Sequence, residues 1–169
     1  MGGMIMVREV TPDDWEMLRD VRLAALAEAP SAFGSTYARE AGFTEERWRG
    51  RISERSVTFF ALAGPADGTS PGAGEPAGLA GVFVEDAAPE LVSMWVRPGA
   101  RGLGLGEALV EAALAWARGR GYPALSLWVT EGNGAARRLY ERCGFRATGE
   151  AQPLPSDPSV PEIRMRRAL

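Results

Sequence analysis

The feature that most constrains this chain is a glycine-rich loop, Arg101-Gly102-Leu103-Gly104-Leu105-Gly106. The run before it, 91–96, reads as a strand, and the run after it, 107–118, has helical spacing. Three glycines at alternate positions let the backbone turn tightly and approach a ligand closely. The helix that follows offers unpaired N–H groups and the positive end of its dipole. A strand, a glycine loop and a helix in this order predict a site for phosphates.

The loop contains no residue suited to cap that helix. Ser, Thr, Asp and Asn are all absent between Arg97 and Gly106, so an external anion can take the place of a capping side chain. Arg101 adds a guanidinium group, whose positive charge and paired N–H donors suit a pyrophosphate. The alternative is a plain strand-to-helix connection that uses glycine only for turning.

Two well-known phosphate loops are excluded by the residues at the start of the helix. A P-loop needs Gly-Lys-Ser/Thr there, whereas Gly106 is followed by Glu107 and Ala108. A dinucleotide fingerprint that began at Gly102 would need glycine at position 107. The loop therefore serves another kind of phosphate site.

Two motifs make the chain resemble the GNAT superfamily of N-acetyltransferases. The first is Arg or Gln, two residues, Gly, one residue, and Gly or Ala, which Arg101, Gly104 and Gly106 match. The second follows the expected fifth strand: residues 133–145 fit Asn-x-x-Ala-x-x-Leu-Tyr-x-x-x-Gly-Phe. The resemblance extends over essentially the whole chain, although the first half matches only in pattern.

The resemblance implies one α/β domain over residues 1–169, with a mixed sheet (α+β) of about seven strands and about four helices. The fourth and fifth strands are expected to splay apart. The length of 169 residues, with 46% hydrophobic and 24% charged residues, is sufficient for one domain with a sizeable core. The sequence itself predicts strands at 4–10, 56–63, 79–85, 90–96, 124–129 and 163–167, and helices from 11 to 30, from 44, over 107–118 and over 133–143.

The resemblance also implies acetyl-CoA as the co-substrate. A splayed strand leaves backbone groups without ladder partners, and a pantetheine arm can pair with them as an added strand would. Asn133 is either a direct cofactor contact or only a helix N-cap. The expected cofactor-binding residues are Trp95, Val96, Arg101, Gly102, Leu103, Gly104, Leu105, Gly106, Asn133 and Tyr140. We expect no metal, because the chain has no His and only one Cys, Cys143.

The reaction implied is direct attack of a neutral amine on the thioester carbonyl. Tyr140 is the candidate general acid, because a phenol of pKa about 10 suits a thiolate of comparable basicity. The alternative is a tyrosine packed on the sheet with its hydroxyl bound by backbone.

Glu90 is the first choice for the general base. It stands where histone-type members of the superfamily carry their catalytic glutamate, at what we expect to be the open end of the fourth strand. Desolvation beside Leu91 and Val92 would raise its pKa towards the working range. A solvated strand-end glutamate is the alternative, and Glu85 and Glu131 are the reserves.

The acceptor is expected to be a primary amine, and a small molecule rather than a protein. The net charge of −3 suits an amine and argues against a general nucleic-acid binder. Phe33 and Tyr37, in an expected loop over 33–37, and the Gly- and Pro-rich loop 64–77 are expected to shape acceptor choice.

The expected partners are acetyl-CoA and the acceptor, with no nucleic acid and no membrane; a homodimer is left open. No stretch approaches the ~18 apolar residues of a membrane span, and Met1 to Met6 contain no basic region, so a cytoplasmic location is expected. The alternative function is a GNAT-like acyl-CoA-binding sensor or interaction domain without turnover. The intact Tyr140 favours the enzyme.

Overall fold

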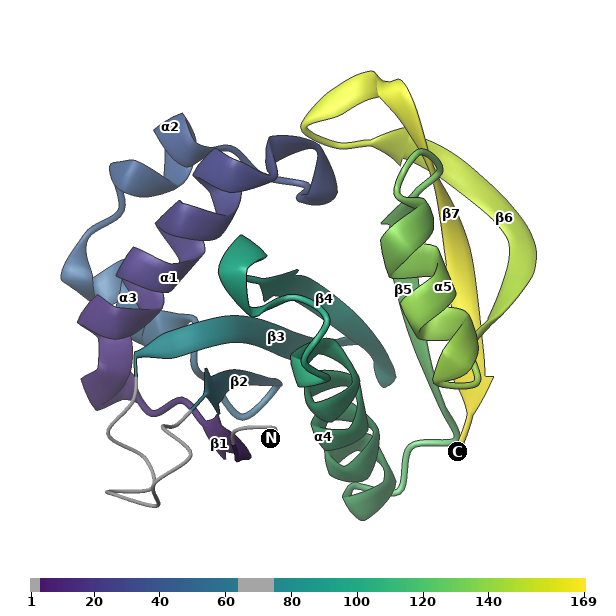
Figure 1. The fold of residues 1–169 in the computed structure, drawn as a ribbon, viewed down its shortest axis with the longest axis horizontal. Helices are drawn as coiled ribbons and strands as arrows, with labels where there is room; N and C mark the ends of the chain where they lie inside the picture. Colours follow the sequence, from purple (N-terminus) through teal and green to yellow (C-terminus); the bar gives the residue numbers. More distant parts are fainter. Residues whose placement is uncertain (1–3, 64–74) are drawn as a thin grey trace.

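The protein folds around a mixed sheet, seen in a computed structural model that describes residues 4–63 and 75–169. Seven strands in these ranges pair in the order β1-β2-β3-β4-β5-β7-β6, which confirms the expected class (Figure 1). The β4–β5 pair is parallel and the other pairs are antiparallel. The strands are β1 (Ile5–Glu9), β2 (Ser56–Ala63), β3 (Pro76–Glu85), β4 (Ala88–Val96), β5 (Ala124–Thr130), β6 (Arg146–Leu154) and β7 (Asp157–Ala168).

Helices pack on both faces of this sheet. Adjacent residues of β2 show the division: Phe59 packs in the cluster that contains the α4 leucines, and Phe60 packs in the cluster that contains α1. This follows because successive side chains of a strand point to opposite faces. None of the helices in the described ranges is long and apolar enough to cross a membrane. The α-helices are α1 (Trp15–Glu28), α2 (Tyr37–Ala41), α3 (Glu45–Gly50), α4 (Leu105–Gly119) and α5 (Gly134–Arg142).

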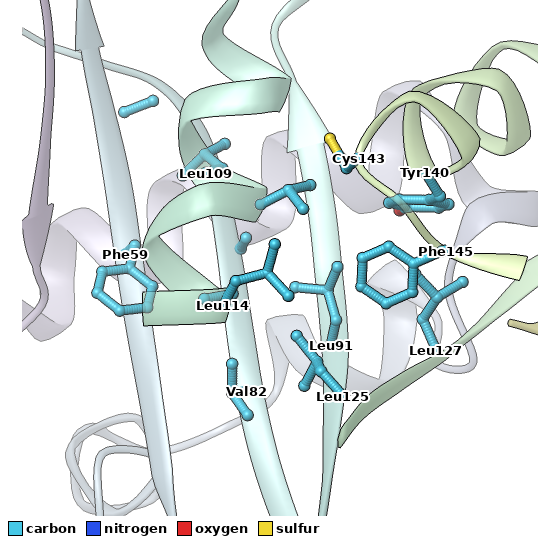
Figure 2. Packing of buried hydrophobic residues seen from close by; sticks show 14 of the residues in the cluster. Phe59, Val82, Leu91, Leu109, Leu114, Leu125, Leu127, Tyr140, Cys143 and Phe145 are labelled. Carbon is cyan, nitrogen blue, oxygen red and sulfur yellow. The ribbon is translucent and has the colours of Figure 1, made fainter. Parts of the chain in front are cut away.

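Helix α4 is the centre of the larger core and connects the parallel strands β4 and β5. Its buried residues, Leu105, Leu109, Val110, Ala113, Leu114 and Ala117, recur at helical spacing. Figure 2 shows Leu109 and Leu114 among strand residues such as Phe59 and Leu91. Because Leu109 is fully buried, truncation to alanine is expected to cost about 2–5 kcal/mol. The core therefore fixes the helix whose N-terminus adjoins the glycine loop.

Strands β4 and β5 separate after a short paired stretch. They pair only at Glu90 with Ser126 and Leu91 with Leu127. Just beyond, the register between β3 and β4 shifts, and Ser93 has a φ of 61°. An extra residue of this kind bends a strand and increases its twist. The bulge thus accounts for the divergence of β4 from β5 visible in Figure 1.

Five α-helices are present in the described ranges, where about four were expected. The additional one is α2, which begins at Tyr37, the last residue of the expected loop 33–37. Its N-cap is Thr36, whose side-chain oxygen accepts a hydrogen bond from the Arg39 amide at 3.2 Å. A helix of five residues is too short to produce a recognisable hydrophobic periodicity in the sequence.

The proline-rich tail forms the β6–β7 hairpin, of which only residues 163–167 were expected as a strand. Pro158 and Pro161 lie in β7, whose pairing with β5 runs only from Glu162 to Ala168. Neither proline therefore has to donate a hydrogen bond to β5, and this edge position tolerates them.

Candidate active site

The glycine loop ends in an uncapped helix N-terminus. Gly104 is the N-cap of α4 with a φ of 90°, and Gly102 has a φ of 81°. No side chain in the described part of the chain caps this end, and the first amide to donate back along the helix is that of Ala108, which bonds the Gly104 carbonyl at 3.1 Å. The amides of 105–107 are thus available to an anion, as the sequence predicted. The helix starts at Leu105, two residues earlier than expected, because the apolar side chain of Leu105 is buried.

A cavity of about 530 Å³ lies beside this loop. Its walls include Trp95 and Val96 at the end of β4, Gly104 in the loop, and Asn133 and Leu139 on the α5 side. A smaller cavity of about 70 Å³ reaches the point where β4 and β5 part. Four residues line both cavities: Ala32, Met94, Asn133 and Ala136. We call the two together the splay cleft.

Most of the expected cofactor residues meet in the splay cleft. Leu103 does not line it and is 60% exposed. Asn133 is the N-cap of α5, with its side-chain oxygen accepting from the Ala136 amide at 3.2 Å. The capping role considered for Asn133 is therefore present, and its place in the cleft leaves a cofactor contact as a prediction.

The two arginines that line the cleft are paired with carboxylates. Arg101 donates from Nη2 to Glu28 Oε2 at 2.8 Å and from Nε to the Val96 carbonyl at 3.0 Å. The Trp95 indole also donates to Glu28 Oε2, at 2.8 Å, and with Arg101 it holds the pKa of Glu28 below its usual value. Arg142 pairs with Glu107 at 3.2 Å. A diphosphate must compete with these carboxylates for the guanidinium groups.

Tyr140 is buried in the inner part of the cleft. Its side chain is 6% exposed and packs edge-on against Phe145, with ring centroids 6.0 Å apart, close to Cys143 (Figure 2). Burial raises the pKa of Tyr140 well above its ordinary value, which makes this phenol a weaker proton donor than an exposed tyrosine. Within the described residues its hydroxyl has no hydrogen-bond partner, so the backbone contact considered as an alternative is not formed there.

Glu90 lies at the closed end of the splay, not at the open end as expected. It is half-buried and stands opposite Ser126 of β5 at one of the two paired positions. The reason is that the bulge at Ser93 separates the strands only after Glu90. Its side chain faces away from α4, since its neighbour Leu91 packs in the α4 cluster. Burial raises the pKa of Glu90, Arg164 opposes this, and Glu162 adds to it.

The reserve carboxylates Glu85 and Glu131 are exposed, at the end of β3 and just after β5. Glu162 is a buried carboxylate that the sequence analysis missed. It accepts a hydrogen bond from Gln152 Nε2 at 2.6 Å. Nothing in the sequence signals it, because its burial depends on the β6–β7 hairpin.

The expected acceptor residues occupy different environments. Phe33 is 3% exposed and packs under the Arg22 guanidinium, 4.7 Å from its ring centroid. Tyr37 begins α2 and is 49% exposed. The 64–77 loop expected to shape acceptor choice lies outside the described residues over 64–74.

A buried charge network that the sequence did not reveal lies beside the bulge. Arg22 donates to both carboxylate oxygens of Glu40 at 3.0 Å, and Arg51 binds the same carboxylate. A third nitrogen of Arg22 donates to Ser93 Oγ at 2.8 Å. These contacts connect α1, α2 and the end of α3 to β4, over separations of up to 71 residues.

Within residues 4–63 and 75–169, no cluster of three His, Cys, Asp or Glu side chains is arranged to hold a metal ion.

Comparisons with known proteins agree with this geometry. Residues 19–145 match the model of the Acetyltransferase (GNAT) family. A mycothiol acetyltransferase of Beutenbergia cavernae is 48% identical over 63 residues, 37% of this chain and 21% of that protein. The chain thus covers about a fifth of the length of this curated relative.

Solved structures resemble the whole chain. A GCN5-related N-acetyltransferase from Kribbella flavida superimposes with a TM-score of 0.67 and 27% identity, covering 98% of both chains. A GNAT-family acetyltransferase from Streptococcus pneumoniae gives a TM-score of 0.75 at 22% identity, over 98% of this chain and 99% of that one.

Proposed function

Because this chain belongs to the GNAT family of acetyltransferases, we propose that it transfers an acetyl group from acetyl-CoA directly to a primary amine. The observation that carries the proposal is the splay cleft, which runs from uncapped helix amides to the Tyr140 side chain. The chain matches relatives named mycothiol acetyltransferase over about a fifth of their length. We therefore do not propose that it uses the same acceptor as they do.

The residues of the cleft fit acetyl-CoA. The amides of 105–107 and the guanidiniums of Arg101 and Arg142 suit a diphosphate, and the separated backbone edges of β4 and β5 suit an amide-containing arm. Glycine at position 106 leaves room for Leu139, because a Cβ there would lie 2.9 Å from a methyl carbon of Leu139 and that side chain would have to shift. The cofactor contacts of Trp95, Val96 and Asn133 belong to the same proposal.

When bound, acetyl-CoA supplies the thioester carbonyl that the amine attacks. Tyr140 Oη would donate its proton to the departing thiolate, and the second N–H proton that the amine loses as the amide forms would restore the phenol. Burial raises the pKa of Tyr140 and so opposes the donation. The Glu90 carboxylate takes a proton from the incoming ammonium, directly or through water. Its raised pKa brings it closer to the working range of a general base.

We further propose a small-molecule acceptor and a cytoplasmic location. The alternative, an acyl-CoA sensor without turnover, is retained because Glu90 lies at the closed end of the splay, away from the loop.

A thiol-release screen tests the proposal. Wild-type protein is assayed with acetyl-CoA against small amines, polyamines, amino acids and peptides, while calorimetry measures acetyl-CoA binding. Release with at least one amine class is expected. Tyr140→Phe should lower turnover by ~10²–10⁴-fold with acetyl-CoA affinity nearly unchanged. Tight binding without release across the panel would instead favour the sensor, and absence of binding would reject both functions.

A further inference from the structure

A second, separate cavity lies on the α1 and α3 side of the sheet, over β2, β3 and β4. Its volume is about 430 Å³. The strand residues beneath it include Thr58, Gly81 and Val92, on the opposite face from the α4 core. Its polar lining consists of Arg22, Arg51, Ser53, Ser56, Thr58 and Ser93. We call this cavity the arginine pocket.

The arginine pocket carries an excess of positive charge. Arg22 and Arg51 share one carboxylate, that of Glu40, whose side chain is 1% exposed. Among residues 4–63 and 75–169, no other charged side chain lines this cavity, so the immediate charge from these residues is about one positive unit. An incompletely neutralised pair of guanidiniums in a partly enclosed space favours an oxyanion.

Hydrogen-bond donors remain after the internal contacts are counted. In its contacts with other described residues, Arg22 uses three of its five N–H groups, two on Glu40 and one on Ser93. Arg51 contacts Glu40 through one nitrogen. Ser93 Oγ accepts from Arg22, so its own proton is still available. These groups can bind an oxyanion without breaking the Glu40 network.

The arginine pocket adjoins the splay cleft at the bulge of β4. Val92 and Ser93 line both the pocket and the small cavity that Tyr140 lines. Ser93 also has a φ of 61°, in the left-handed region that non-glycine residues rarely adopt. Strain of this kind is tolerated where surrounding contacts hold it, and here Arg22 supplies the contact.

We propose that the arginine pocket binds an oxyanion carried by the amine acceptor. Preferred acceptors are then amines with a carboxylate or phosphate, rather than polyamines or simple amines. This inference rests on the proposed function, since it places the reacting amine beside Tyr140 and the anionic group beside Arg51.

The test compares acceptors that differ only in the oxyanion. The proteinogenic amino acids are assayed against their decarboxylated amines, and phosphoethanolamine is assayed against ethanolamine. In at least one pair, kcat/KM is expected to favour the anionic member by about tenfold or more. The two arms distinguish a carboxylate from a phosphate.

Variants then connect that preference to the pocket. Arg51→Gln should lower the ratio of kcat/KM between the two members of the favoured pair about tenfold, and Arg51→Lys should restore part of it. Arg49→Gln is the matched control: it also removes one positive charge, two residues before Arg51, but Arg49 pairs with Glu45 and does not line the pocket.

Product binding gives a readout that does not depend on turnover. In the presence of CoA, calorimetry measures product affinity for wild type and Arg51→Gln. Each N-acetyl amino acid is compared with the matching N-acetyl amine, and N-acetylphosphoethanolamine is compared with N-acetylethanolamine. Tighter, Arg51-dependent binding of an anionic product supports the pocket even if no amine is acetylated, which would reject the proposed function alone. Three results would overturn this inference. They are acetylation with no preference for the anionic member of any pair, no binding of any anionic product, and a preference for the anionic member that is unchanged in Arg51→Gln.

Discussion

Gly104 is the residue whose backbone most directly shapes the anion site, because it is the N-cap of α4 with a φ of 90°. We predict that Gly104→Asp abolishes measurable acetyl-CoA binding, since it would add a negative charge at the N-cap of α4, next to the anion position, and repel a diphosphate. Gly104→Asn is the matched control, because Asn has nearly the same shape, tolerates left-handed φ similarly and carries no charge.

Calorimetry with acetyl-CoA measures the difference, and circular dichroism checks that both variants fold. Substitution at Gly106 is less informative, because an added Cβ would press on Leu139. A folded Gly104→Asp protein that binds acetyl-CoA with wild-type affinity would contradict the assignment of the loop.

Glu90 is the residue whose proposed role depends on pH. A base must be deprotonated, and burial raises the pKa of Glu90, so the rate should fall as pH drops through a value above that of an ordinary glutamate. We predict that Glu90→Gln lowers the rate most between the pKa of Glu90 and that of the acceptor ammonium, where Glu90 is deprotonated but the acceptor still has to lose a proton, and that an alkaline assay partly restores it.

The pH profile of kcat/KM is measured for wild type, Glu90→Gln and Glu85→Gln. Glu85 serves as the control because it is exposed at the end of β3. If Glu90→Gln retains the wild-type profile, the base lies elsewhere, and Glu131 and Glu162 are tested next.

At the scale of elements, the bulge in β4 decides where the sheet opens. Ser93 holds a φ of 61° and its hydroxyl accepts from Arg22. We predict that Ser93→Val lowers the free energy of unfolding by about 2 kcal/mol or more, because a β-branched residue is strained in this conformation and cannot accept the hydrogen bond.

Ser93→Gly is the companion variant, since it loses the same hydrogen bond but relieves the backbone strain. Urea unfolding should therefore rank Ser93→Gly above Ser93→Val in stability. Equal stabilities would show that the left-handed conformation is not what constrains this position.

At the scale of the whole molecule, the Arg22–Glu40–Arg51 network couples stability to pH. Burial by itself would raise the pKa of Glu40, but hydrogen bonds and charge from Arg22 and Arg51 outweigh it and lower the pKa from 4.5 to about 2. A carboxylate whose pKa is lower in the folded state than in the unfolded state stabilises the fold at pH values above the unfolded-state pKa. That stability is lost as pH falls from about 5 towards 2, and amounts to about 3 kcal/mol.

We predict that Glu40→Gln is destabilised by about 3–5 kcal/mol at neutral pH, because two guanidiniums lose their shared buried partner. Its free energy of unfolding should also fall less steeply than that of wild type below pH 5. Denaturant titrations at several pH values measure both effects. Parallel pH dependences of the two proteins would show that Glu40 is not the group responsible.

Local patterns determined much of the fold and of the cofactor site before any tertiary information. The β-rich run Ser56–Ala63 and the caps at Thr44 and Asn133 depend on neighbours within a few residues, and the structure contains each of them. The glycine loop is also local, because positive φ at Gly102 and Gly104 and an uncapped helix follow from adjacent residues. Strong short-range preferences of this kind are readable from one sequence.

Only the tertiary structure decided which distant residues share a site. The pairing of Glu28 with Arg101 joins residues 73 apart, and the contact from Arg22 to Ser93 joins residues 71 apart. The position of Glu90 relative to the splay also depended on where the bulge falls, which is set by the pairing of β3 with β4. Local sequence preferences fix the conformation of a segment, whereas burial, ion pairing and strand separation depend on which segments pack together, and that is a property of the whole folded chain.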